Sequence, residues 1–305
     1  MFDIVVIGAG PAGMTAALYA RRAEKSVLVI EKSTFGGQIT HSPKVENYPG
    51  FVSASGNELA GALLEQIMAQ GAEIELDTVT GIEGTPGNYV VVAENARYEA
   101  KSVIIATGAK HRTLGIEGEE RFTGEGISYC AVCDGAFYKD KTVAMIGGGN
   151  SALVEAVMLS DICKKVYVIQ NLDFLTGEKK LQDTLFKKSN VEFMLSTVVT
   201  GIIGEETFEG LALRNEKTGE ERRLALDGTF VAIGHMPENE PFSDRVTLNE
   251  YGYVVADESC RPEGAMDGIY VAGDCRTKTV RQITTATADG AAAALLACSF
   301  VDNLN

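Results

Sequence analysis

The sequence predicts an α/β fold built from two doubly wound domains that each have a dinucleotide-binding architecture. Residues 3–31 and residues 142–170 share one order of elements: an apolar strand, a glycine-rich turn, an alanine-rich helix and a second apolar strand. This order is typical of the dinucleotide-binding half of a parallel sheet. The length of 305 residues allows two domains, each with its own hydrophobic core.

The first segment carries the pattern Gly8-x-Gly10-x-x-Gly13. The first glycine permits a tight turn, the second lets a pyrophosphate approach the backbone, and the third packs the helix on the strand. The phosphates then face the free N–H groups of the helix N-terminus. Glu31 ends the second strand, where a carboxylate accepts hydrogen bonds from ribose hydroxyls. We therefore expect an adenine dinucleotide without a 2′-phosphate in this segment.

The second segment keeps the turn but lacks the groups that recognise the ribose. Its pattern is Gly147-x-Gly149-x-x-Ala152, and Gln170 stands where the first segment has its carboxylate. Residues 171–176 contain no Arg or Lys that could bind a 2′-phosphate. The turn is expected to form, while its recognition of a pyridine nucleotide is expected to be weak.

A pair of cysteines, Cys130 and Cys133, is followed directly by Asp134. A two-residue gap at the start of a helix lets both sulfurs form a reducible disulfide and favours a thiolate at neutral pH. The alternative is half of a structural zinc site, which needs a second Cys or His pair. The remaining cysteines are scattered singly, so we expect a redox dithiol and no metal; they are Cys163, Cys260, Cys275 and Cys298.

Composition limits the partners. A net charge of −15 argues against nucleic acid and against anionic membranes. We find no apolar run of about 18 residues and no basic leader before the first strand, and we expect a cytoplasmic protein with no membrane span. One basic stretch, residues 178–188, reads as a helix with four lysines. It is either a solvated face or a docking surface for an acidic protein.

The chain resembles the low-molecular-weight thioredoxin reductases over nearly its whole length. The order and spacing of the matching stretches together carry the resemblance. These stretches are Gly8-Ala9-Gly10-Pro11-Ala12-Gly13, Gly36-Gly37-Gln38, Glu46-Asn47-Tyr48-Pro49-Gly50, Ala106-Thr107-Gly108-Ala109, Cys130-Ala131-Val132-Cys133-Asp134-Gly135, Gly234-His235, Gly273-Asp274 and Arg281-Gln282.

The resemblance implies that the second domain is inserted in the first and that the protein is a homodimer. Residues 1–112 and 239–305 would form an FAD-binding domain, and residues 113–238 would form the inserted domain with the cysteine pair. The residues implied in FAD binding are Gly8, Gly10, Pro11, Ala12, Gly13, Glu31, Gly37, Gln38, Asn47, Thr107, Gly108, Gly273, Asp274, Arg281 and Gln282.

The resemblance also implies catalytic roles. Cys133 would face the flavin, Cys130 would attack the disulfide of a thioredoxin, and Asp134 would move the thiol proton. A carboxyl group beside two thiols can be desolvated, which raises its pKa toward neutral. His235 would either assist proton transfer or serve as a structural turn residue.

The chain departs from the family at the second nucleotide site. NADPH-dependent members have His-Arg-Arg-x-x-x-Arg where this chain has Gln170-Asn171-Leu172-x-x-x-Thr176. Each charge-assisted hydrogen bond contributes about 1.5–3 kcal/mol. Losing two weakens binding of a 2′-phosphate by roughly two to four orders of magnitude. The pattern resembles atypical members that take electrons from a ferredoxin- or flavodoxin-type carrier.

Two alternatives stay open at this point. The same disulfide reductase could use NADH or, weakly, NADPH. A non-catalytic, redox-sensing flavoprotein is the rival from another class, and the intact Cys130-x-x-Cys133-Asp134 argues against it because a sensor has no need of the proton carrier.

Overall fold

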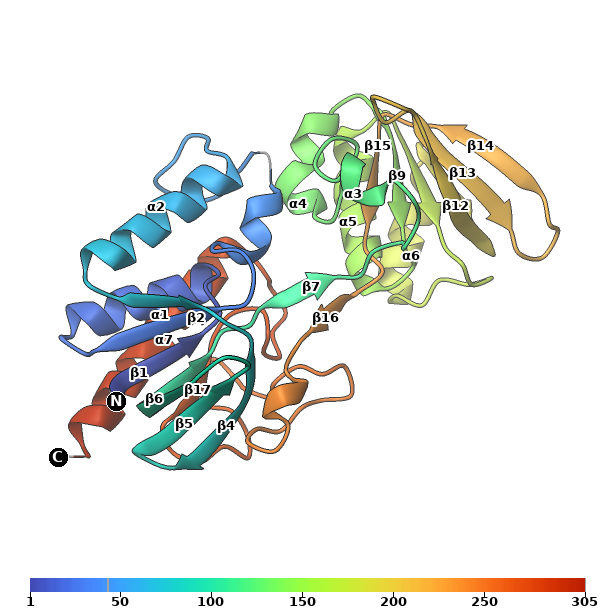
Figure 1. Cartoon of the computed structure of the whole chain (residues 1–305). Helices are drawn as coiled ribbons and strands as arrows, with labels where there is room; N and C mark the ends of the chain where they lie inside the picture. Colours follow the sequence, from blue (N-terminus) through green and yellow to red (C-terminus); the bar gives the residue numbers. More distant parts are fainter. Residues whose placement is uncertain (43, 305) are drawn as a thin grey trace. The chain divides into compact units, whose positions relative to one another are not determined.

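The computed structural model describes residues 1–42 and 44–304 and divides into two compact units (Figure 1). The outer unit comprises Met1–Lys110 and Met236–Asn305, and the inserted unit comprises His111–His235. The sequence-based boundaries at 112 and 238 lie two and three residues further along the chain. The chain leaves the outer unit in β7 (Ala109–His111) and returns in β16 (His235–Pro237), and these two strands pair.

The outer unit is built on a seven-stranded mixed sheet with the order β3-β2-β1-β6-β5-β4, in which β17 also pairs with β6. Strands β3, β2, β1, β6 and β17 are parallel, and the β4–β5 hairpin is antiparallel. Burial on both faces explains why the central strands are almost continuously apolar. The strands are β1 (Phe2–Ile7), β2 (Val27–Glu31), β3 (Glu73–Leu76), β4 (Val79–Thr85), β5 (Asn88–Ala93), β6 (Arg97–Ile105) and β17 (Ile269–Val271).

Two helices of the outer unit, α1 (Pro11–Arg22) and α7 (Ile283–Asp302), pack closely on each other. Both are rich in alanine and each contains one glycine, which lets their backbones approach. A Cβ atom added at Gly290 of α7 would overlap the carbonyl oxygen of Ala12. The remaining helical segments of this unit are η1 (Gly37–His41), α2 (Gly56–Ala69) and η3 (Glu240–Phe242).

Helix α7 is longer and more apolar than the sequence analysis indicated. Its 18-residue window has a mean hydropathy of 1.3, so by length and composition alone it could cross a membrane. The sequence reading missed it because alanines, glycine and threonines break the run of large apolar residues. Its buried residues pack against α1 in the core of the outer unit, which is the pattern of a buried core helix.

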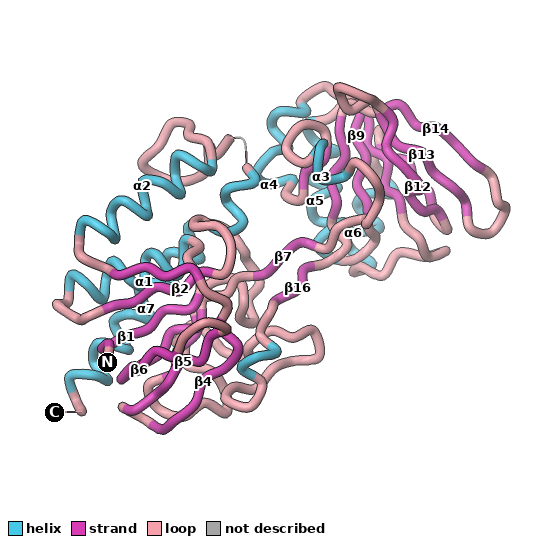
Figure 2. The backbone as a smooth tube through the Cα atoms, in the orientation of Figure 1, coloured by secondary structure: helices cyan, strands magenta, loops and turns pink. Residues whose placement is uncertain are grey.

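The inserted unit contains a five-stranded parallel sheet with the order β11-β10-β9-β15-β8 and a separate antiparallel sheet, β12-β13-β14 (Figure 2). Its strands are β8 (Ile127–Ser128), β9 (Thr142–Ile146), β10 (Lys165–Ile169), β11 (Val191–Met194), β12 (Thr197–Ile203), β13 (Gly210–Asn215), β14 (Glu221–Ala225) and β15 (Gly228–Val231). Its helices are α3 (Glu119–Phe122), α4 (Ala131–Asp134), η2 (Gly135–Tyr138), α5 (Asn150–Ile162) and α6 (Lys179–Phe186).

The two similar sequence segments form the same structural unit in both domains. The first gives β1-α1-β2 and the second gives β9-α5-β10, with parallel strands in each case. The prediction of two doubly wound, dinucleotide-binding domains is therefore confirmed.

Two helical glycines offer a test of this packing. Gly290→Ala should lower the stability of the protein by about 1–3 kcal/mol because the added methyl group meets the backbone of Ala12. Gly61→Ala, in α2, should raise it by about 0.5–1 kcal/mol because nothing lies within 4 Å of the added atom. Thermal unfolding followed by circular dichroism measures both. Equal midpoints for the two variants would contradict the close α1–α7 approach.

Candidate functional site

The glycine-rich turn of the outer unit joins β1 to α1. Gly8 has φ +106°, and a side chain on it would collide with the carbonyl group of Ala106. A Cβ atom on Gly13 would overlap the carbonyl oxygen of Gly8. Helix α1 begins at Pro11 after Gly10, and no side chain caps its first N–H groups. The turn therefore presents uncapped donors to a phosphate, as the pattern predicts.

Glu31 ends β2 beside this turn, and its carboxylate is buried. Oε2 accepts a hydrogen bond from the amide of Ala9 at 2.8 Å, and Oε1 accepts from the amides of Lys32 and Ser33 at 3.0 Å. These bonds orient the carboxylate at the end of the strand, next to the position that the ribose of a dinucleotide would take.

A second stretch of backbone lies against the glycine turn. The amide of Gly36 donates to the carbonyl of Ala9 at 2.8 Å. Gly37 has φ +58°, and a Cβ atom on it would lie 3.4 Å from the Cα of Gly10. Gln38 follows in η1. A side chain at position 37 would therefore narrow the space between the loop at Gly37 and the glycine turn at Gly10, where both backbones can face one ligand.

Two expected site residues far apart in sequence meet directly. Asn47 Nδ2 donates to Gln282 Oε1 at 3.2 Å. Gln282 is the N-cap of α7, so the loop that holds Asn47 is joined to the start of that helix.

Thr107 and Gly108 follow the carboxyl end of β6, as expected. The hydroxyl of Thr107 donates to Asn239 Oδ1 at 2.8 Å, and the buried amide of Asn239 donates to the carbonyls of Gly252 and Cys275. Asn239 thus ties the end of β6 to the loop after β17. The sequence reading missed Asn239 because a single Asn between prolines follows no recognisable pattern.

Asp274 follows β17, and its carboxyl group is buried with Oδ1 lacking any hydrogen-bond partner among the described residues. Burial raises the pKa of Asp274 to about 6, although the positive charges of Lys278 and Arg281 oppose the shift. A buried polar atom normally has a partner. An unpaired carboxyl oxygen beside the glycine turn is what a ligand rich in hydroxyl groups would satisfy, and the ribityl chain of FAD fits this requirement.

Arg281 lies next to Asp274. Its Nε donates to the backbone carbonyl of Asp274 at 3.4 Å, and its guanidinium group lies 4.4 Å from the ring centroid of Tyr253. The side chain is therefore held along the loop that follows β17.

A buried ion-pair cluster that the sequence reading missed supports the same loop. Arg276 is fully buried and donates to both carboxylate oxygens of Asp289, on α7, at 2.9 Å. Lys278 Nζ and the amide of Gly273 also donate to Asp289. Burial alone would raise the pKa of Asp289, but these hydrogen bonds outweigh it and lower the pKa. The pairing links residues 13 positions apart, which no short motif encodes.

The inserted unit contains the dithiol. Cys130 and Cys133 form a disulfide with their Cα atoms 5.3 Å apart. Cys130 is the N-cap of α4, and its Sγ accepts a hydrogen bond from the amide of Cys133 at 3.2 Å. The predicted placement of the pair at a helix start is confirmed.

Asp134 ends α4 with its carboxyl group buried. Oδ2 accepts from the hydroxyl of Ser128 at 2.6 Å, and Oδ1 has no partner among the described residues. Burial raises the pKa of Asp134, and the Ser128 hydrogen bond offsets only part of this rise. Ser128 Oγ also accepts from the amide of Cys130 at 3.1 Å. Ser128 therefore connects the acid to the cysteine segment, and no sequence pattern had indicated it.

His235 lies at the end of the inserted unit, in β16. Its ring centroid is 4.5 Å from that of His111, which stacks on Tyr129 at 5.2 Å. The structure thus places His235 in an aromatic cluster, and its part in proton transfer stays a prediction.

The other four cysteines are buried free thiols that form no disulfide. Burial raises the pKa of both Cys163 and Cys260 to about 11, which disfavours the reactive thiolate. The described residues contain no group of three or more His, Cys, Asp or Glu side chains that could hold a metal ion.

The second glycine turn is intact but covered by an uncharged side chain. Gly147 approaches the carbonyl of Ala232 closely, as a tight turn requires. The buried side chain of Gln170 packs on Gly148, where an added Cβ atom would lie 2.7 Å from its Cδ. The amide and hydroxyl of Thr176 both donate to the carbonyl of Gly148. Residues 170–176 are thus held against the turn, and none of them is an Arg or a Lys.

The basic stretch is shorter than predicted. Helix α6 spans Lys179–Phe186, and Lys188, beyond it, pairs with Asp161. Asp183 lies at helical spacing between Lys180 and Lys187. This mixture of charges favours the interpretation as a solvated face.

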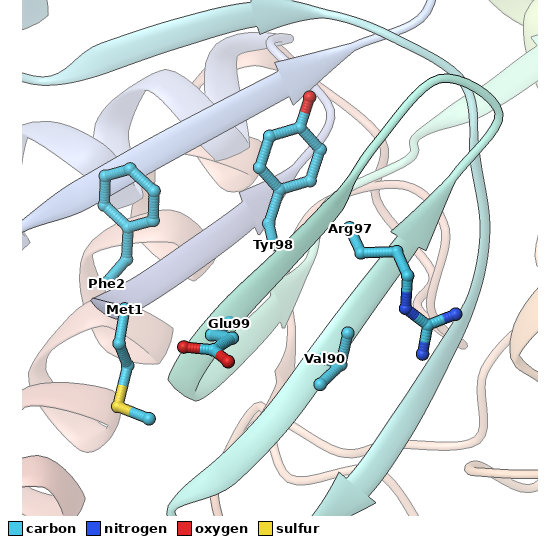
Figure 3. A pocket seen from close by; sticks show the side chains of 6 residues that line it. All are labelled: Met1, Phe2, Val90, Arg97, Tyr98 and Glu99. Atoms are coloured by element: carbon cyan, nitrogen blue, oxygen red, sulfur yellow. The ribbon is translucent and has the colours of Figure 1, made fainter.

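A hollow on the outer unit lies away from all of these groups (Figure 3). It is at the amino ends of β1 and β6, whereas Gly8 and Thr107 follow the carboxyl ends of the same strands. Ligands of doubly wound sheets bind at the carboxyl ends. The hollow is lined by Met1, Phe2, Val90, Arg97, Tyr98 and Glu99.

Comparison with known proteins places these features in a family. The family model described as pyridine nucleotide-disulphide oxidoreductase matches residues 2–290. A thioredoxin reductase of Bacillus subtilis is 41% identical over 100% of this chain and 96% of its own. A 34.2 kDa protein in the rubredoxin operon of Clostridium pasteurianum is 40% identical over 98% of this chain and 97% of its own. The crystal structure of thioredoxin reductase from Streptococcus pyogenes has a TM-score of 0.94 at 41% identity and covers 99% of both chains.

The Ser128 hydroxyl gives a direct test of the site geometry. It stabilises the ionised form of Asp134, so Ser128→Ala should raise the pKa of Asp134 further, by about one unit. Carbon-13 NMR titration of the aspartate carboxyl groups, with Asp134→Asn for assignment, measures this. Ser160→Ala is the matched control because the Ser160 hydroxyl donates only to a backbone carbonyl. An unmoved Asp134 midpoint in Ser128→Ala would contradict the described contact.

Proposed function

The chain belongs to the pyridine nucleotide-disulphide oxidoreductase family, and we propose that within it the chain takes electrons from a ferredoxin- or flavodoxin-type carrier instead of NADPH. The coarser function is that of a thioredoxin reductase, an FAD-dependent flavoenzyme that reduces a disulfide, as its full-length relatives at about 40% identity are named. Because these full-length relatives are enzymes, the alternative of a non-catalytic, redox-sensing flavoprotein is set aside.

The observation that supports the donor proposal is the chemistry of residues 170–176. Gln170 packs on the glycine turn, and exposed Asn171, Leu172 and Thr176 offer a 2′-phosphate no positive charge. Lys217 pairs with Asp173, within this stretch, at 2.7 Å, so its charge is already partnered by a carboxylate. The Clostridium pasteurianum relative is a protein of the rubredoxin operon, and rubredoxin is itself a small redox protein, which supports a carrier of this kind.

The alternative donor is NADH or, weakly, NADPH. The intact Gly147–Ala152 turn favours it, because the backbone that would receive a pyrophosphate is present. Against it, the residue at the ribose position is Gln170, which carries no charge to accept two hydroxyl donors as a carboxylate does.

In the outer unit, we propose that the residues around the first glycine turn hold FAD. The N-terminus of α1 would receive the pyrophosphate, Glu31 the ribose and Asp274 Oδ1 a ribityl hydroxyl. FAD, when bound, supplies the two electrons that reduce the disulfide. The protein's own contribution is to orient the cofactor and to exclude water from the buried carboxyl groups.

In the inserted unit, we propose separate roles for the two sulfurs. The Cys130 thiolate attacks the disulfide of thioredoxin, and one thioredoxin sulfur leaves with a proton from Asp134. Cys133 then attacks Cys130, which restores the Cys130–Cys133 disulfide and releases thioredoxin with both sulfurs reduced. The amide of Cys133, which donates to Cys130 Sγ, stabilises the attacking thiolate. We further propose a homodimer in the cytoplasm, with His235 assisting proton transfer.

Flavin bleaching under anaerobic conditions tests the donor. NADPH at physiological concentration should reduce the flavin very slowly, because a 2′-phosphate meets no cation in residues 170–176. A reduced ferredoxin or flavodoxin should reduce it readily. Stopped-flow absorbance gives both rates. Rapid, saturable reduction by micromolar NADPH would overturn the donor proposal and leave the disulfide reductase intact.

A gain-of-function variant makes the matched control. Asn171→Arg, Leu172→Arg and Thr176→Arg combined restore the family's cations at exposed positions. This variant should bind NADPH roughly two to four orders of magnitude more tightly than the wild type, with little change for NADH. If the affinities for NADPH and NADH rise equally, the three arginines do not recognise the 2′-phosphate.

Trapping tests the roles of the sulfurs. Cys133→Ser leaves Cys130 free to attack but unable to be displaced, so it should form a stable mixed disulfide with thioredoxin. Cys130→Ser should form none and should lose thioredoxin reduction. Mass spectrometry of the unreduced proteins distinguishes the two variants, and a mixed disulfide on Cys133 alone would reverse the assignment.

A further inference from the structure

A second carboxyl group lies under the dithiol segment and has no part in the mechanism above. Glu155, in α5, accepts a hydrogen bond at 3.0 Å from the amide of Ala131, the residue that follows Cys130. Helices α4 and α5 pack on each other within the inserted unit. The Glu155 side chain therefore reaches from one helix to the backbone between the two cysteines.

We propose that Glu155 is a positioning residue that couples reduction of the Cys130–Cys133 disulfide to uptake of a proton by its own carboxylate. The inference rests on the redox role of the dithiol in the proposed function and is independent of the electron donor.

The first argument is the place of the hydrogen bond. The Ala131 amide is the N–H group nearest in sequence to Cys130 on its C-terminal side, and Glu155 Oε2 occupies it. The amide of Cys133 donates to the Cys130 sulfur at 3.2 Å and also to the Cys130 carbonyl at 3.1 Å. A carboxylate and a thiolate would thus share one turn of backbone, and two negative charges this close disfavour each other.

The second argument is the ease with which Glu155 takes a proton. Burial raises the pKa of Glu155 to about 7, although the hydrogen bond from Ala131 opposes the rise. The group therefore changes charge in the range where the enzyme works. The negative charge of a nearby thiolate raises the pKa of Glu155 further, so that the carboxylate takes up a proton near neutral pH.

Among the described residues, other titratable groups lie on the elements that pack against α5. The disulfide, Asp134 and Tyr138 face α5 from α4 and η2, and Asp134 holds its hydrogen bond with Ser128. On β10, Lys165 pairs with Glu192 and lies over the ring of Tyr167, and β9 has no titratable side chain. On α6, Lys179, Lys180 and Asp183 are the charged residues. None of these contributes to the pKa shift of Glu155.

The chemistry balances as follows. Two electrons break the sulfur–sulfur bond, one proton from solvent forms a thiol, and the other sulfur is left as a thiolate. Where Glu155 is ionised in the disulfide form, a second proton from solvent binds its carboxylate as the thiolate forms. By reciprocity, a protonated Glu155 favours the reduced dithiol by the same factor.

The test uses the FAD-loaded enzyme and its dithiol–disulfide equilibrium with dithiothreitol. Alkylation and mass spectrometry of the Cys130–Cys133 peptide give the reduced fraction from pH 6 to 9. Glu155→Gln keeps an oxygen for the Ala131 amide but cannot ionise. The variant and the wild type should agree near pH 6. Near pH 9, the equilibrium constant for reduction of the disulfide should be roughly tenfold larger in Glu155→Gln than in the wild type. This factor corresponds to an interaction of one pKa unit between the carboxylate and the thiolate.

Three further measurements keep the outcome interpretable. Asp161→Asn, an exposed carboxylate on the same helix that pairs with Lys188, should follow the wild type at every pH. Glu155→Asp should restore part of the pH dependence if Glu155→Gln folds poorly. Alkylation of Cys130 in the reduced enzyme should reach its midpoint at lower pH in Glu155→Gln.

Each outcome has one meaning. Identical pH profiles for the wild type and Glu155→Gln would overturn the inference and leave the reductase function untouched. A wild-type disulfide that no thiol couple reduces would instead remove the redox role of the dithiol itself.

Discussion

The outer unit depends on a close approach of three backbone segments around Ala12. Gly13 lies against the carbonyl of Gly8, Gly290 of α7 lies against the carbonyl of Ala12, and Gly273 lies against its Cβ atom. No side chain fits between these segments, so the start of α1, the end of β17 and the middle of α7 are held at one distance. The glycine turn, Asp274 and helix α7 all belong to these segments. The close packing around Ala12 therefore sets their positions relative to one another. Since a methyl group disturbs it, the constraint is steric and leaves little tolerance.

Four buried carboxyl groups show how partners decide what such a group can do. Glu31 accepts three amide hydrogen bonds at the end of β2, and Asp289 is paired with two cations and holds the loop after β17. Asp134 and Asp274 each keep one oxygen without a hydrogen-bond partner in the part of the chain that the structure describes, and burial raises the pKa of both. The two carboxylates that accept hydrogen bonds on both oxygens are held in fixed positions, whereas Asp134 and Asp274 each have an oxygen available for a proton or a ligand.

The sequence predicted the parts of this protein that local chain geometry encodes. Both glycine turns, the helix start at the cysteine pair and Glu31 at the end of β2 are features of consecutive residues, and spacing alone reveals them. The contacts that it missed join residues of different structural elements. Asn239 bridges two loops, Arg276 meets Asp289 across the start of α7, and Ser128 of β8 reaches Asp134 of α4. Single polar residues of this kind become recognisable only when the fold supplies their partners. The family resemblance did supply Asn47 and Gln282, which meet although 235 positions separate them.

The burial of the four single cysteines has a consequence for the life of the enzyme under oxidative stress. Peroxide and electrophiles attack thiolates, and all four of these thiols are sealed in the core with a pKa raised by burial. Only Cys130 and Cys133 offer accessible sulfur, and their oxidised form is a normal state of the catalytic cycle. Oxidation of the reduced pair gives the same disulfide that the reductase cycle reduces, whereas burial shields the other four thiols from the oxidant.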